Sequence, residues 1–248
     1  MMETLPTTHA NMPYDGRFLL SDPRTGSPLS DALIETTHTR KVHLFVIDQS
    51  LRDYQHIHPT PTQEDGVYAF HFTPHSNQPY SVWVEFTRQG NDHADRIKLE
   101  LPHTSALSFM PTLTPSKNAQ IGNIQAEWLE AADAPLQQGT STEIQIRLTD
   151  AQGNSITQLD DIMGAKAHMA GFSADGKNFI HTHPMPTDDL SCLRFHIQPE
   201  HAGMSRFFLQ IQHDEEELCL PFTRMIKSLD RHTERSASTP SLTASPCR

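Results

Sequence analysis

A histidine pattern that occurs twice has the clearest capacity for chemistry in this chain. In the first copy, twelve residues separate His43 from the segment His56-Ile57-His58-Pro59. In the second copy, twelve residues separate His168 from His181-Thr182-His183-Pro184, and every position is offset by 125. Neutral imidazole is the commonest metal ligand at physiological pH. The pattern therefore predicts two metal sites, one formed by His43, His56 and His58 and the other by His168, His181 and His183.

The match between the two copies extends beyond the histidines. Residues 43–74 and 168–199 share nine identities in 32 aligned positions, where average residue usage predicts about two. A strand-like segment followed by an Asp-to-Gly turn precedes each copy, at 16–26 and 144–153. We interpret the chain as an internal duplication.

Composition limits the classes of function. The chain has 248 residues, enough for two domains, and a formal net charge of −11, which argues against a nucleic-acid partner. Its three cysteines form no CxxC pair, and no apolar run is long enough to span a membrane. The start lacks the pattern of a signal peptide, so the sequence as written predicts a cytoplasmic protein; a misassigned start would make it periplasmic or envelope-associated.

Short alternating segments dominate the chain, at 42–48, 54–58, 67–73 and 81–86, and no long stretch has helical periodicity. The predicted fold is all-β, with two tandem Ig-like antiparallel β-sandwich domains. Residues 14–102 form the first domain, 103–120 a linker and 121–222 the second domain, in which 121–130 is an extra first strand. The low-complexity tail 231–248 is predicted to be disordered.

Strand pairing explains how three histidines could converge. The dipeptide Asp175-Gly176 predicts a two-residue hairpin turn that places His168 opposite His183, with His181 on the same face. The same register in the first domain places His43 opposite His58, although the loop between the strands is wider there. Opposed Cβ atoms lie about 4.5–5.5 Å apart, so the imidazoles can reach one ion. Aromatic and aliphatic residues share this face, which is predicted to be the core face, with the histidines half-buried at one end: Phe45, Ile47, Tyr54, Phe172 and Phe179.

Other residues refine the predicted metal. Thioether ligands together with imidazole would favour copper over zinc, and four methionines lie near the second copy: Met163, Met169, Met185 and Met204. Met169 is better explained as a core residue. Alternation places His71 and His196 away from the core, which makes them doubtful ligands.

Two alternatives to metal handling remain. The histidines could be structural in a protein-interaction module. A metal-dependent hydrolase would need a general base, for which only Glu64 and Asp188 lie nearby. The His-x-His followed by Ser191 is similar to a zinc isopeptidase signature, but Arg194 stands where its final aspartate belongs.

The segment from Ile162-Met163-Gly164-Ala165 to His183-Pro184 resembles a recurring bacterial motif, Leu-Gly-Ala-x-x-His, a hairpin and His-x-His-Pro. The segment from Lys41 to Pro59 looks like its partner half. This motif occurs in poorly characterised, mostly envelope-associated proteins, and the resemblance covers most of 14–222. It implies paired Ig-like or copper-chaperone-like domains and a role related to heavy metals. A typical relative is exported, and no export signal is visible in this sequence as written.

The predicted function is therefore binding of copper, or else zinc, for sequestration, delivery or sensing without turnover. The predicted partners are the metal ion and, in the interaction alternative, another protein. Because imidazole must be neutral to bind a metal, affinity is expected to fall as the pH drops through about 6.5.

Overall fold

The computed structural model describes residues 6–103, 110–129, 135–186 and 191–229. The first domain contains the strands β1 (Tyr14–Leu19), β2 (Val42–Asp48), β3 (Tyr54–Ile57), β4 (Thr60–Pro61), β5 (Val67–Phe72), β6 (Tyr80–Phe86) and β7 (Asp95–Glu100), with one 3-10 turn, Asp31–Leu33. The second domain contains β8 (Asn118–Ile121), β9 (Ile124–Leu129), β10 (Thr142–Thr149), β11 (Ala167–Ser173), β12 (Phe179–Thr182), β13 (Cys192–Ile197), β14 (Gly203–His213) and β15 (Glu216–Ile226).

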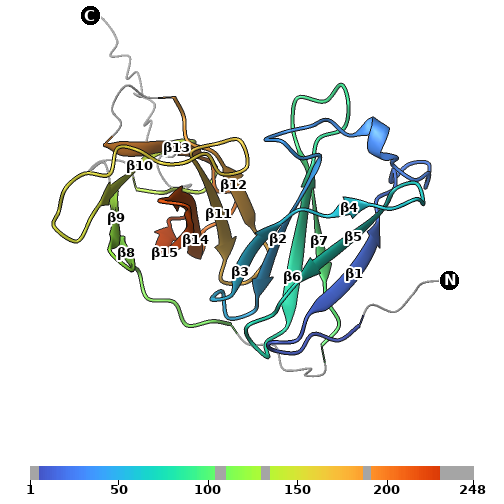
Figure 1. Cartoon of the computed structure of the whole chain (residues 1–248), viewed down its shortest axis with the longest axis horizontal. Coiled ribbons are helices and arrows are strands. Elements are labelled where there is room, and N and C mark those ends of the chain that lie inside the picture. The colour runs from blue at the N-terminus through green and yellow to red at the C-terminus, as the bar shows by residue number, and fades with distance from the viewer. Residues whose placement is uncertain (1–5, 104–109, 130–134, 187–190, 230–248) are drawn as a thin grey trace, which may run out of the picture.

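The first domain is a sandwich of two antiparallel sheets, ordered β1-β5-β4 and β3-β2-β6-β7 (Figure 1). Strand β1 alternates as a strand of a half-buried sheet should, with every second residue buried. The two inner faces enclose one apolar core that includes Tyr14, Leu44 and Val84. Seven strands divided between a three-stranded and a four-stranded sheet form an immunoglobulin-like sandwich, as predicted.

The second domain repeats this plan with an addition. Its sheets are ordered β13-β10-β9-β8 and β12-β11-β14-β15, and they enclose a core around Trp128, Met169 and Phe207. The segment predicted as one extra strand, 121–130, belongs instead to a hairpin of β8 and β9, because Gly122 takes a positive φ of 54° and turns the chain. Strand β8 thus begins at Asn118, inside the range assigned to the linker, and the predicted tail 231–248 lies outside the described residues.

The hairpins that carry the histidines have the predicted register. Phe45 pairs with His56, and its counterpart Ala170 pairs with His181. A two-residue type I′ turn needs a positive φ at both central residues, and of Asp175 and Gly176 only Gly176 has one. The loop is therefore wider than the predicted two-residue turn. The side chain of Ser173 closes this loop by accepting hydrogen bonds from the backbone N–H groups of 177 and 178.

The face that carries the histidines is not the sandwich core, which corrects the sequence prediction. Every residue of β2 and of β11 is buried, because both faces of these strands are covered. One face lines the core of its own domain. The other meets the opposite domain in an interdomain cluster, defined by the buried side chains Phe45, Ile47, Leu51, Ala170, Phe172, Phe179 and Phe208.

The sheet β3-β2-β6-β7 of the first domain therefore packs against the sheet β12-β11-β14-β15 of the second, with β2 and β3 beside β11 and β12 (Figure 1). The histidines lie in this interface. His43, His56 and His168 are 2, 8 and 0 % exposed, so they are more deeply buried than the half-buried state predicted from sequence. Among the described residues, no helix has the length and apolar character needed to cross a membrane.

Candidate metal centre

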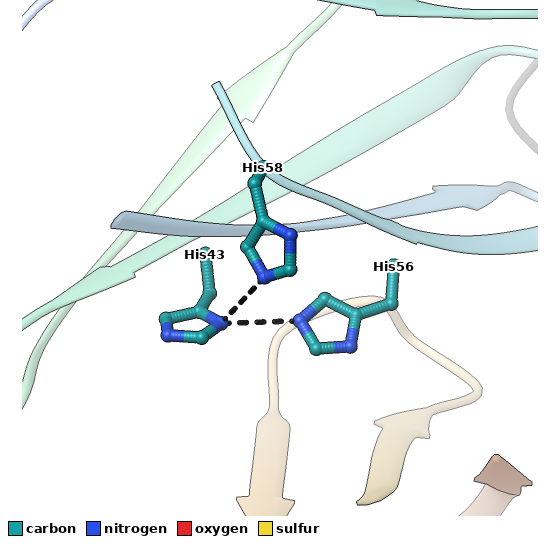
Figure 2. A group of neighbouring side chains, drawn as sticks. All are labelled: His43, His56 and His58. Atoms are coloured by element: carbon teal, nitrogen blue, oxygen red, sulfur yellow. Dashed lines mark hydrogen bonds between the residues drawn. The ribbon is translucent and has the colours of Figure 1, made fainter. Parts of the chain in front are cut away.

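The three histidines of the first domain converge on one point, as Figure 2 shows. His43 comes from β2, His56 from β3, and His58 follows directly after β3. The Nδ1 atom of His43 lies 3.2 Å from Nε2 of His56 and 3.2 Å from Nε2 of His58. Two nitrogens bound to one tetrahedral ion at about 2.0–2.1 Å would lie about 3.3 Å apart. The spacing therefore suits a shared ion with little movement.

Hydrogen bonds on the far side of each ring fix which nitrogens face the centre. His43 donates from Nε2 to the carbonyl oxygen of Thr37, at 3.0 Å, and His56 donates from Nδ1 to Oε1 of Gln210, at 3.0 Å. In the neutral rings, the facing nitrogens of His43 and His56 therefore both carry lone pairs. No proton is available for a hydrogen bond between them. A cation placed between these lone pairs would relieve their repulsion.

The second domain repeats this arrangement. His168 comes from β11 and His181 from β12, and His183 follows β12. One nitrogen of each ring is buried without a hydrogen-bond partner among the described residues: Nδ1 of His168, Nε2 of His181 and Nε2 of His183. Each of the three rings brings one nitrogen within 4.8 Å of a nitrogen of the other two. The partnerless nitrogens are the counterparts, in order, of the nitrogens that face one another in the first domain. Buried polar atoms without partners are uncommon, and a cation could bind to one nitrogen of each of these three rings at once.

A tight turn before each β-hairpin orients the first histidine of the trio. His168 donates from Nε2 to the carbonyl oxygen of Ile162 at 3.0 Å, and Ile162 is offset by 125 from Thr37. Both turns are closed by paired backbone hydrogen bonds across two residues of positive φ, which is type I′ geometry. Backbone carbonyls in this role fix the tautomer of a metal-binding histidine.

The second histidine of each trio is held by the opposite domain. His181 donates from Nδ1 to Oε1 of Glu85 at 2.5 Å, whereas His56 donates to Gln210. Glu85 and Gln210 are themselves offset by 125 and stand opposite His43 and His168 in their own sheets. Sequence reasoning missed this pair. The available signal was one polar residue at the same position of two apolar runs, 82–86 and 207–211.

Burial governs the protonation of the trios. Desolvation lowers the pKa of His58 and that of His168 to about 4 each, and it lowers the pKa of His183 to about 2 with help from the neighbouring histidines. Desolvation also lowers the pKa of His43 and, further, that of His56. These five rings are therefore neutral at physiological pH, which is the form that binds metals.

Glu85 is the ionised partner in this buried region. Burial alone would raise its pKa, but the hydrogen bond from His181, together with the charge and hydrogen bond of Arg96, lowers it. Arg96 donates from Nε to Oε2 of Glu85 at 2.6 Å, so each carboxylate oxygen has a partner.

The two trios face each other across the interdomain cluster. The ring centroids of His56 and His168 are 5.2 Å apart, and those of the reciprocal pair, His181 and His43, are 6.2 Å apart. Phe45 lies between them, 4.4 Å from the ring of His56 and 4.5 Å from that of His181. Pairs of counterpart residues thus contact one another reciprocally, so the domains meet through equivalent surfaces, as in a two-fold dimer.

A cavity of about 830 Å³ in the second domain reaches the edge of its trio. His183 and Met185 line it, together with His38 of the first domain. The ring of His38 stacks on that of His183 with centroids 3.6 Å apart. His38 is therefore another residue near the second trio that the sequence did not single out.

Other residues considered from sequence lie elsewhere. Met169 is fully buried in the core of the second domain, as predicted. His71 and His196 are exposed on β5 and β13 and contribute to neither trio, also as predicted. Glu64 is exposed, and Asp188 lies outside the described residues.

Comparison with known proteins identifies a family. The family described as Domain of unknown function (DUF8832) matches residues 9–102 and again 121–228. Among curated proteins, none matches the chain.

Several solved structures are similar in part. The Lin-41 filamin domain is 17% identical, with 41% of this chain and 91% of that one covered and a TM-score of 0.29. A titin fragment is 10% identical, with coverage of 92% and 95% and a TM-score of 0.23. An endo-fucoidan hydrolase of glycoside hydrolase family 107 is 13% identical, with coverage of 94% and 29% and a TM-score of 0.28. Likenesses this weak have no bearing on function.

Proposed function

The chain belongs to the DUF8832 family, and we propose that it binds two transition-metal ions, one in each histidine trio. The ligands would be His43, His56 and His58 in the first domain and His168, His181 and His183 in the second. The role would be sequestration, delivery or sensing of the metal.

One observation carries this proposal. In the second trio, one buried nitrogen of each ring has no hydrogen-bond partner among the described residues, and each ring brings one nitrogen within 4.8 Å of a nitrogen of the other two. Histidines with a purely structural role would have these nitrogens satisfied, because an unpaired buried polar atom costs about 1–3 kcal/mol. A bound cation satisfies all three at once. In the first trio, Nδ1 of His43 lies 3.2 Å from Nε2 of His56 and from Nε2 of His58, which supports an equivalent site there.

Copper stands ahead of zinc in this proposal. Imidazole ligands suit both metals, whereas a thioether favours Cu(I). Met185 lines the cavity beside His183. In the second domain, Met163 takes the same turn position as His38 in the first, and both residues have a positive φ. Thioethers thus accompany imidazoles around the interface.

Metal content of the untagged protein tests the proposal. Elemental mass spectrometry is expected to find about two equivalents of one metal, and thermal melting with Cu(I), Cu(II) or Zn(II) is expected to rise by several degrees for the ion that binds. His58→Ala and His183→Ala form a matched pair, because each removes one ligand from a different trio. Each is expected to retain one equivalent, whereas His71→Ala, a change at an exposed histidine outside both trios, should retain two.

The interaction-module alternative gives the opposite results. In that case no metal would be retained and no ion would shift the melting temperature. His58→Ala and His183→Ala would then change only stability. This outcome would reject the metal-binding proposal and assign the histidines a structural role at the domain interface.

A further inference from the structure

The two trios differ most in the residue behind their second histidine. In the second domain, His181 Nδ1 donates to the carboxylate of Glu85. In the first domain, His56 Nδ1 donates to the amide oxygen of Gln210. The amide orientation is fixed, because Gln210 Nε2 donates to Glu217 Oε1 at 2.6 Å. Two sites with equivalent ligand atoms therefore have an anionic partner in one case and a neutral partner in the other.

We propose that Glu85 makes the second-domain trio the higher-affinity metal site, which fills first, and that Gln210 leaves the first-domain trio as the weaker site, which releases its ion more readily. This inference rests on the proposed function, since it assumes that both trios bind metal. Glu85 and Gln210 are positioning residues here, because each acts through a histidine of the opposite domain.

The chemistry of the two partners supports this order. A carboxylate that accepts the far N–H of a histidine makes the ring a more basic ligand and fixes its orientation, and loss of such a partner commonly costs 10–100-fold in metal affinity. The carboxylate also places a negative charge near the ion in a buried region where charges interact strongly. Glu85 is only 8 % exposed.

The surrounding charges leave this difference in place. Arg96 binds Glu85 through the oxygen that His181 does not use. Its own side chain is 39 % exposed, so water screens its charge more than that of Glu85. At the first trio, Arg40 acts on His58 as a nearby positive charge, which disfavours a second cation. The carboxylate of Glu217 accepts a hydrogen bond from the amide nitrogen of Gln210. Among the described hydrogen bonds, none joins Glu217 to a histidine of the first trio.

The test is a competition titration of the full-length chain with Zn(II), a redox-inert probe, against a chromophoric chelator. Wild-type protein is expected to bind two ions in steps that differ at least tenfold in affinity. His183→Ala should abolish the tighter step and His58→Ala the weaker one, which assigns each step to a trio.

Substitutions at the two partner positions then test the cause. Glu85→Gln should weaken the tighter step about 10–100-fold with two ions still bound, whereas Gln210→Glu should strengthen the weaker step. The double exchange should reverse the order of filling, which a merely structural defect would not do. Glu100→Gln, at an exposed carboxylate of β7, is the matched control and should change neither step.

Each alternative outcome is decisive. Two equal steps in the wild type, or steps that neither Glu85→Gln nor Gln210→Glu alters, would overturn this inference and leave metal binding intact. If Glu85→Gln fails to fold, Gln210→Glu alone still tests the idea, because an unchanged weaker step would contradict it. Absence of any bound metal in the wild type, with copper as well as zinc, would instead reject the proposed function itself.

Discussion

Thr39 of the first domain packs against Gly164, its own counterpart in the second. The Cγ2 atom of Thr39 lies 3.0 Å from the position that a Cβ atom of Gly164 would occupy. Both residues have a positive φ, 70° and 82°, in the type I′ turns that orient His43 and His168. The two turns thus meet at a point where the domains are related by approximate two-fold symmetry.

Gly164→Ala is therefore expected to destabilise the protein beyond the cost of the backbone alone. A left-handed conformation costs an L-residue about 1–2 kcal/mol. Gly153→Ala is the matched control, because Gly153 has a φ of 84° and open space around it. Urea unfolding should show a larger loss of stability for Gly164→Ala. Equal losses would mean that the contact between the turns adds nothing to stability.

Phe45 is expected to support both trios at once. Its ring is fully buried between His56 and His181, so Phe45→Ala should cost about 3–5 kcal/mol. The metal affinity of both sites should fall, since both histidines lose a packing partner. Phe72→Ala removes a similar ring from the core of the first domain, away from the histidines. In titrations of folded protein, this control should lose stability without the loss of affinity at the second trio.

The metal-free protein is expected to lose stability as the pH falls below about 6.5. Unfolded histidines take up protons near this pH, whereas burial keeps His43, His56 and His168 neutral in the folded state. The unfolded state then binds more protons, so each of these rings can lower the stability by up to about 1.4 kcal/mol per pH unit. For His168 the loss should end near pH 4, where the folded state is also protonated.

Urea unfolding of metal-free protein at several pH values from 7.5 to 4 measures this slope. His168→Gln should reduce the slope by about one proton. A stability that stays constant between pH 6.5 and 5 would show that the buried rings do not resist protonation.

Metal binding by the first trio is expected to persist at lower pH than free histidine would allow. Burial lowers the pKa of His58 to about 4, and it lowers those of His43 and His56 as well. Protons therefore compete weakly at this site until the pH falls well below 6.5. In the His183→Ala variant, which isolates the first trio, affinity should change little between pH 7.5 and 5.5. A steep loss beginning at pH 6.5 would contradict this expectation.

Sequence reasoning found the trios and their pairing because both depend on local periodicity. An identical spacing of His43, His56 and His58 with their counterparts marked the duplication, and strand alternation placed each trio on one face. The pairing of Phe45 with His56 then confirmed the register. These relationships connect residues within one hairpin, so they need no knowledge of how the domains dock.

The features that could not be predicted all depend on contacts between domains. Apolar residues on both faces of β2 left it undecided which face formed the core, so Phe45 and Phe172 were assigned to a core that they do not enter. Glu85 lies 96 residues from His181, and no periodicity connects them. Only the docked arrangement shows that each domain completes the surroundings of the other domain's site.

Covalent linkage has a consequence for an interface built from equivalent surfaces. Two separate chains would have to find each other, and such a pair would fall apart on dilution. Within one chain the second domain is always present at a high effective concentration, set by the connecting segment. Both halves of the interface also have their own residues in this one chain, so a mutation changes only one of them. Glu85 and Gln210 can therefore be different residue types at equivalent positions.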